Sequence, residues 1–140
     1  SLGKFFGLAG LRVGFVLGET TLLKQLADRL GPWPIAHASR YVAQLALQDK
    51  MWQQQCRHDL SEQGKRLQQL LASVGLNPHG SCTLFQWVKT DKAAFIHQSL
   101  AQRGILTRSF STPSSLRFGL PKTEANWQRL EIALQQLDCS

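Results

Sequence analysis

The chain has 140 residues, of which 43% are hydrophobic and 18% are charged, and its formal net charge is +7. This length suits one domain with a hydrophobic core, and the composition excludes an intrinsically disordered chain. The 16 lysines and arginines are dispersed, so the charge does not favour nucleic-acid binding, and no apolar run approaches the roughly 20 residues of a membrane span.

Glycines divide the first stretch, Ser1–Gly18, and the apolar run Leu11–Leu17 within it predicts a short strand. Glu19–Leu30 predicts a helix that has leucines on one face and is capped by Thr20 or Thr21. A Gly-Pro-Trp-Pro sequence then ends this helix, because proline cannot continue it.

Two helical patterns follow, over Ile35–Asp49 and Lys50–Val74. Gly64 weakens the second helix by about 1 kcal/mol relative to alanine without ending it. Gly75 is a candidate cap for its C-terminus. A helical pattern of this length is typical of a connection between two domains.

The rest of the chain alternates between strand and helix patterns. Strands are predicted over Thr83–Lys89, Ile105–Phe110 and Ser115–Gly119, and helices over Asp91–Arg103 and Thr123–Leu137. This order predicts the α/β fold class, with a small α+β domain built on one sheet.

The first residue is not methionine, and the only methionine is Met51, so we expect the chain to be a fragment of a longer protein. We expect residues 1–33 to be the end of a larger domain. Residues 34–140 are expected to form a smaller C-terminal domain together with its linking helix.

The sequence does not indicate a metal site. Cys56, Cys82 and Cys139 form no CxxC pair, and the four histidines are scattered, so the ligand spacing of a zinc site is missing. We expect free thiols in a reducing cytoplasm.

The first 14 residues combine an amine, a guanidinium and a hydroxyl. Lys4 precedes Arg12 by eight residues, with glycines between them, and Ser1 precedes the lysine by three. A lysine can attack an aldehyde carbon as a free amine, and an arginine offers a planar fork to phosphate oxygens. Glycines let the backbone approach a ligand closely. This set suits a phosphorylated aldehyde, and it matches neither a Walker loop nor a Rossmann fingerprint.

The segment S-L-G-K-F-F-G-L-A-G-L-R-V-G resembles the lysine region of fold-type I pyridoxal-phosphate (PLP) enzymes, the class I/II aminotransferase family. The resemblance implies that Lys4 forms the Schiff base with PLP, and that Ser1 and Arg12 contact the cofactor phosphate. Many relatives carry Ser or Thr directly before the lysine, where this chain has Gly3, so one hydroxyl contact is absent. The resemblance also implies the C-terminal domain of such an enzyme, with a long inter-domain helix and a homodimeric parent.

A second candidate site lies in the strand predicted over Ser115–Gly119. Arg117 stands between a leucine and a phenylalanine, so its side chain points away from its buried neighbours. The resemblance implies that Arg117 binds the substrate carboxylate and that Arg108 helps to hold a substrate phosphate. For both arginines, a solvated position on an ordinary strand stays the alternative.

Further similarity extends over G-P-W-P, L-F-Q-W-V, G-I-L and L-R-F-G-L-P, which lie across nearly the whole chain. It resembles the threonine-phosphate decarboxylases of cobalamin biosynthesis. The implied substrate is a small phosphorylated amino acid, L-threonine O-3-phosphate, with neither nucleic acid nor membrane as a partner. An aminotransferase of the histidinol-phosphate type stays the alternative, because it uses the same lysine to break the Cα–H bond. The family's other cofactor residues precede the lysine, so we expect this chain alone to be inactive and to bind PLP weakly or not at all.

Two alternatives belong to other functional classes. The net charge of +7 would also suit a stand-alone basic binding module, and the helix around Met51–Leu71 would suit an oligomerisation domain. Binding to DNA or RNA that weakens steeply with salt would favour the first, and self-association would favour the second.

Overall fold

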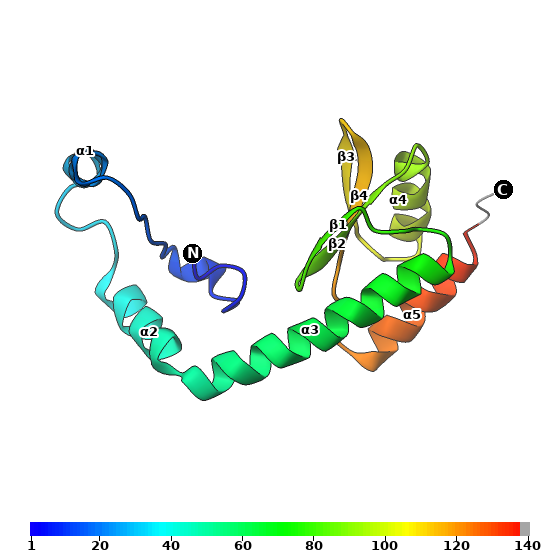
Figure 1. Ribbon diagram of the computed structural model, residues 1–140, viewed down its shortest axis with the longest axis horizontal. Coiled ribbons are helices and arrows are strands. Elements are labelled where there is room, and N and C mark those ends of the chain that lie inside the picture. The colour runs from blue at the N-terminus through cyan, green and yellow to red at the C-terminus, as the bar shows by residue number, and fades with distance from the viewer. Residues whose placement is uncertain (138–140) are drawn as a thin grey trace. The chain divides into compact units, whose positions relative to one another are not determined.

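The computed structural model describes residues 1–137, and in them the chain forms five α-helices, one 3-10 helix and four strands (Figure 1). The chain divides into two compact units, residues 1–54 and the part that begins at Gln55. Among the described residues, no helix combines the length and the apolar character that crossing a membrane requires. The boundary expected between residues 33 and 34 of this chain, which would separate two domains of the parent protein, stays a prediction.

The first unit contains the 3-10 helix η1 (Ala9–Leu11), the helices α1 (Thr20–Leu30) and α2 (His37–Gln48), and the first turn of α3 (Lys50–Ser73). The two helices predicted in this part of the chain are confirmed, each within two residues of the expected ends. The predicted cap of α1 is wrong, because the capping position is Glu19, whose side chain accepts no cap hydrogen bond. The buried hydrophobic residues of this unit are Leu2, Val13 and Ala43.

The strand predicted over Leu11–Leu17 is wrong. This segment forms no strand, and Phe15, Val16 and Leu17 are 61%, 60% and 95% exposed. A strand requires a neighbouring strand for its backbone hydrogen bonds, and residues 1–137 place none beside this segment. The last three residues of the apolar run are therefore exposed in this chain, whereas Val13 is buried.

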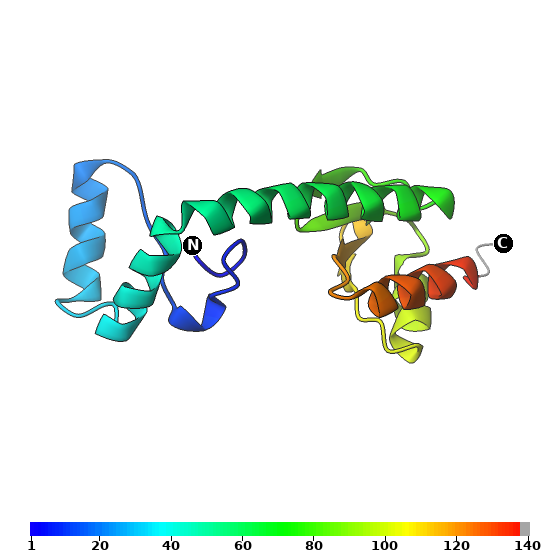
Figure 2. The ribbon, with the colours of Figure 1, turned by 90° about the horizontal axis from the view of Figure 1, so that it is seen from below.

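Helix α3 is continuous, as the sequence predicted, and Gly64 lies buried inside it. Figure 2 shows the β1–β2 hairpin lying along the C-terminal half of α3. A Cβ added at Gly64 would lie 3.5 Å from the backbone of Thr83, in the turn of that hairpin. A Cβ at this position would thus be in ordinary van der Waals contact with the hairpin. Gly75 follows the helix with a φ of 78° and caps its end as predicted, since the N–H of Leu76 donates back to Leu71.

The second unit is built on one antiparallel sheet with the strand order β1-β2-β4-β3. Its strands are β1 (Gly80–Cys82), β2 (Phe85–Lys89), β3 (Arg108–Ser111) and β4 (Ser114–Gly119), and its further helices are α4 (Ala93–Gln102) and α5 (Glu124–Gln135). The fold class predicted from the sequence, a small α+β domain with one sheet, is confirmed.

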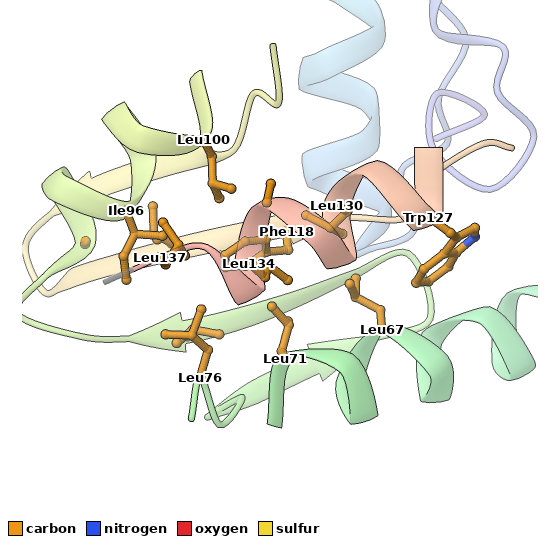
Figure 3. Packing of buried hydrophobic residues seen from close by; sticks show 14 residues of the cluster. Leu67, Leu71, Leu76, Ile96, Leu100, Phe118, Trp127, Leu130, Leu134 and Leu137 are labelled. Atoms are coloured by element: carbon orange, nitrogen blue, oxygen red, sulfur yellow. The ribbon is translucent and has the colours of Figure 1, made fainter. Parts of the chain in front are cut away.

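Three helices cover one face of this sheet. The side chains of Val88, Leu116 and Phe118 alternate toward that face and are at most 2% exposed. Figure 3 shows how leucines from all three helices converge over Phe118. The labelled helix residues are Leu67, Leu71, Ile96, Leu100, Trp127, Leu130 and Leu134. The opposite face carries arginines together with the aromatic rings of Phe85, Trp87 and Phe110.

The strands differ from the prediction in number and at several of their ends, since β2 begins at Phe85 and β4 begins at Ser114. The strand expected over Thr83–Lys89 is the second arm of a hairpin, because β1 precedes it and pairs with it. Strand β3 begins at Arg108 rather than at Ile105. The N–H of Ile105 donates to the carbonyl of Leu100 at 2.9 Å, which closes the end of α4 around Gly104.

The remaining predicted helices, over Asp91–Arg103 and Thr123–Leu137, are confirmed within two residues. Cys56 and Cys82 are free thiols, and Cys139 lies outside the described residues.

Candidate functional site

The lysine segment, residues 1–14, folds into a compact loop held by its own backbone. The N–H of Leu2 donates to the carbonyl of Val13 at 3.2 Å, and that of Leu8 donates to the carbonyl of Leu2 at 3.0 Å. The N–H of Gly7 donates to the carbonyl of Lys4 at 3.0 Å, in a turn whose φ of 67° favours glycine. Leu2 and Val13 are buried while Lys4 is exposed, so the loop has an apolar anchor and a free amine.

The three residues predicted to bind the cofactor, Ser1, Lys4 and Arg12, line a single open cavity of about 300 Å³. The rest of its wall consists of Gly3, Leu8, Ala9, Val13 and Gly14. A Cβ added at Gly3 would lie 3.5 Å from Ala9 Cα and 3.8 Å from Ser1 Oγ, which are ordinary contact distances. The loop therefore has room for the Ser or Thr expected in relatives at this position.

Arg12 has an unusual backbone. With φ of 54° and ψ of 38° it lies in the left-handed region, and it is the one non-glycine residue with positive φ among residues 1–137. This conformation costs an L-residue about 1–2 kcal/mol relative to a right-handed one. A side chain kept at such a position, where glycine would be less strained, marks a candidate functional residue.

Within residues 1–137, no carboxylate lines the cavity that holds these two cations. Arg12 Nη1 donates to the carbonyl of Ala9 at 3.3 Å, and Lys4 Nζ has no partner within the described part of the chain. The salt bridges that the structure describes, Lys65–Glu62 and Arg66–Glu124, lie in the second unit. An amine, a guanidinium and a hydroxyl in one cavity without a carboxylate form a setting that favours an anionic ligand.

The other two predicted site residues, Arg108 and Arg117, meet on the sheet of the second unit. They are direct partners in the register of β3 and β4, so both side chains rise from the same face. The Arg117 guanidinium lies 4.5 Å from the ring centre of Phe85, and that of Arg108 lies 5.3 Å from the ring centre of Phe110. In residues 1–137 neither forms an ion pair.

Trp52 is a feature of the first unit that the sequence does not connect with the lysine. Its ring packs on Phe5 and Phe6, the two residues that follow Lys4. The residue is 42% exposed. A contact across more than 40 residues leaves no local pattern in the sequence.

Comparison with known proteins gives consistent matches. A family model described as aminotransferase class I and II matches residues 1–134. A threonine-phosphate decarboxylase of Pseudomonas aeruginosa is 52% identical over 134 residues, which are 96% of this chain and 40% of that protein. A second one, from Sinorhizobium, is 36% identical over 99% of this chain and 41% of that protein. A histidinol-phosphate aminotransferase of Thermoanaerobacter is 33% identical over 90% of this chain and 37% of that protein.

Solved structures match as well. The histidinol-phosphate aminotransferase of Sinorhizobium meliloti, in complex with pyridoxal-5'-phosphate, has a TM-score of 0.72 and 25% identity over 96% of this chain and 38% of that one. An aminotransferase candidate from Burkholderia pseudomallei has a TM-score of 0.82, 22% identity and coverage of 95% and 42%, which demonstrates a shared fold. The chain spans about 40% of the length of the curated relatives it matches.

Proposed function

The chain belongs to the aminotransferase class I and II family, and we propose that it is the C-terminal part of a PLP-dependent enzyme with Lys4 as its catalytic lysine. The observation that carries this proposal is the cavity in which Lys4, Arg12 and Ser1 meet without a balancing carboxylate. The family membership is the reason for proposing PLP as the cofactor, and the side chains that line this cavity have the chemistry to bind it.

The donor set fits a phosphorylated aldehyde. The guanidinium of Arg12 and the hydroxyl of Ser1 would bind phosphate oxygens, and the amine of Lys4 would condense with the aldehyde carbon, releasing one water. Gly14 approaches Ser1 closely, since a Cβ there would lie 3.7 Å from Ser1 Cβ. When bound, PLP supplies a pyridine ring that accepts the electron pair of a broken Cα bond.

In the proposed reaction, Lys4 transfers a proton to or from the substrate Cα. With the substrate bound, the Lys4 amine would be free and would lie near Cα. In a decarboxylation, the bond from Cα to the carboxylate breaks, carbon dioxide leaves, and the Lys4 ammonium donates a proton to Cα. In a transamination, the Lys4 amine instead removes the proton from Cα.

Arg117 and Arg108 are the proposed ligands of the substrate's anionic groups, the carboxylate and the phosphate respectively. Two like charges directly opposite each other on neighbouring strands repel, which costs stability in the free protein. An anion beside both guanidiniums would remove that repulsion. The stacking of each guanidinium over a phenylalanine also fixes the direction of its donors.

Between the two reactions, we propose decarboxylation of L-threonine O-3-phosphate. The identity of 52% to a threonine-phosphate decarboxylase, against 33% to a histidinol-phosphate aminotransferase, favours it. The second reaction stays the alternative because the same residues serve both. A homodimeric parent and a cytoplasmic location stay predictions.

The full-length enzyme tests the reaction directly. It is incubated with PLP and threonine phosphate, and carbon dioxide release is measured beside the formation of keto acid. The proposal predicts stoichiometric carbon dioxide and an amino-alcohol phosphate, with both lost in Lys4→Ala. Keto acid formed in step with loss of PLP's aldehyde would assign the aminotransferase reaction. If the enzyme forms neither carbon dioxide nor keto acid, the proposed function is contradicted.

A further inference from the structure

Three aromatic rings join the lysine loop to the start of α3. Phe5 and Phe6 follow Lys4 directly, and their ring centres lie 5.0 Å apart in an edge-to-face arrangement. The ring of Trp52 lies 5.5 Å from Phe5 at 65° and 5.7 Å from Phe6 at 22°. Trp52 therefore contacts both rings at once, one near its edge and the other by stacking.

These contacts bear on Lys4 because the chain between them is short. The peptide after Lys4 carries Phe5, and the carbonyl of Lys4 accepts the N–H of Gly7 at 3.0 Å. The turn Lys4–Gly7 is thus closed by one hydrogen bond, and its two middle residues are held by Trp52. Fixing those residues fixes the backbone direction from which the Lys4 side chain extends.

Trp52 lies in the first turn of α3, which is fixed by hydrogen bonds. Its N–H donates to Asp49 Oδ1 at 2.9 Å, which satisfies a free donor of the first turn of α3. One residue later, Gln53 Nε2 donates to the carbonyls of Ala46 and Leu47 at the end of α2, both at 3.0 Å. Gln53 is only 5% exposed. The joint between the two helices therefore holds Trp52 in place.

From these contacts we propose that Trp52 is a positioning residue for Lys4. Its indole ring fixes Phe5 and Phe6 and so directs the Lys4 amine toward the aldehyde of PLP. This inference rests on the proposed function, since it concerns the covalent bond between Lys4 and the cofactor. Reactions between groups held in position depend strongly on orientation, and a supporting residue acts through that orientation.

The test measures the rate of covalent attachment at saturating PLP in the full-length enzyme. Samples are reduced with borohydride at timed intervals, and mass spectrometry counts the cofactor on Lys4. At saturation the first-order rate constant depends neither on cofactor affinity nor on the folded fraction. A purely structural role would lower the amplitude and leave this rate constant unchanged.

Trp52→Ala is expected to lower this rate constant about fivefold or more, because two aromatic contacts are lost and each corresponds to about a two- to tenfold effect. Trp52→Phe keeps a ring and is expected to restore the rate to within about twofold of the wild type. Phe6→Leu removes the stacked ring from the loop side and is expected to slow attachment as Trp52→Ala does. Trp33→Ala is the matched control, because Trp33 is 73% exposed and stacks on His37, away from Phe5 and Phe6.

A wild-type rate constant in both Trp52→Ala and Phe6→Leu would overturn the inference while leaving the proposed function intact. If Trp52→Ala does not fold, Phe6→Leu and Trp52→Phe decide the same question. Failure of the wild-type enzyme to attach PLP at Lys4, by contrast, would be a failure of the proposed function itself.

Discussion

At Arg12 the backbone conformation favours glycine, whereas the proposed function requires a charged side chain. Its left-handed conformation would suit glycine better, whereas its guanidinium is the only one that reaches the cavity of Lys4 in the described structure. Strain of this kind persists where the surrounding structure and the function require it. Substitutions at Arg12 can therefore separate the cost in stability from the gain in binding.

We predict that Arg12→Gly is more stable than Arg12→Ala by about 1 kcal/mol, since glycine adopts this φ without a Cβ clash. Urea unfolding of the 140-residue chain measures that difference. In the full-length enzyme both variants are expected to bind PLP about ten- to a hundredfold more weakly, because each lacks the charged donors. Arg12→Lys keeps a charge and serves as the control. Wild-type affinity in Arg12→Gly would show that the guanidinium does not hold the phosphate.

For single residues, the sequence predicted which side chains bind the cofactor but not the backbone conformation that carries them. The order of Ser1, Lys4 and Arg12 predicted one cofactor-binding group, and the structure places all three on one cavity. The left-handed backbone of Arg12 could not be predicted, because positive φ is expected at glycine, and the motif offers four glycines nearby. The contact of Trp52 with Phe5 and Phe6 depends on the fold and leaves no local signal.

Among the elements, α3 and α5 are joined by one charged clamp. Arg66 donates to both carboxylate oxygens of Glu124, at 2.7 and 2.6 Å, and its guanidinium lies 4.4 Å from the ring centre of Trp127. The hydrogen bond from Arg66 lowers the pKa of Glu124 below its ordinary value. A carboxylate whose pKa falls on folding stabilises the fold above its unfolded pKa, and this contribution is lost as pH falls through the folded pKa.

Glu124→Gln is therefore expected to unfold at lower urea concentration than the wild type near neutral pH. The gap between the two midpoints should narrow as the pH falls through the lowered pKa of folded Glu124, because protonation removes the charge that Arg66 binds. Arg66→Gln should show the same closing gap and a residual loss at low pH, since its stacking on Trp127 is also removed. A gap that does not narrow at acid pH would mean that the clamp does not contribute through its charge.

Helices were predicted better than strands, for a physical reason. A helix satisfies its hydrogen bonds within itself, so a helix such as α4 or α5 can be recognised from its own residues. A strand requires a partner, which the sequence does not name. The run Leu11–Leu17 is apolar enough for a strand and forms none, whereas the three residues Gly80–Cys82 form one because β2 lies beside them.

For the whole molecule, the sequence predicted one small sheet but neither its order nor its register. The order β1-β2-β4-β3 places the last strand in the middle, and the register sets Arg108 opposite Arg117. This pairing strengthens the case for Arg108, whose role the sequence supported only weakly. A register shifted by one residue would have turned one of the two guanidiniums to the buried face.

The two units also differ in how much of their apolar surface they bury. The second unit buries a continuous core, while in the first unit Phe15, Leu17 and Met51 are between 61% and 95% exposed. With about 40% of the relatives' length present, we expect the 140-residue chain to bind PLP more weakly than the full-length enzyme does. The central claim therefore has to be tested in the full-length enzyme.

The most direct test of that claim is to locate the covalently bound cofactor. The full-length enzyme is saturated with PLP, reduced with borohydride and digested, and the modified peptide is sequenced by mass spectrometry. The expected result is one reduced cofactor on Lys4 per chain, with none in Lys4→Ala. Attachment at another lysine while Lys4 stays unmodified, or the same yield in Lys4→Ala, would contradict the assignment of Lys4 as the catalytic lysine.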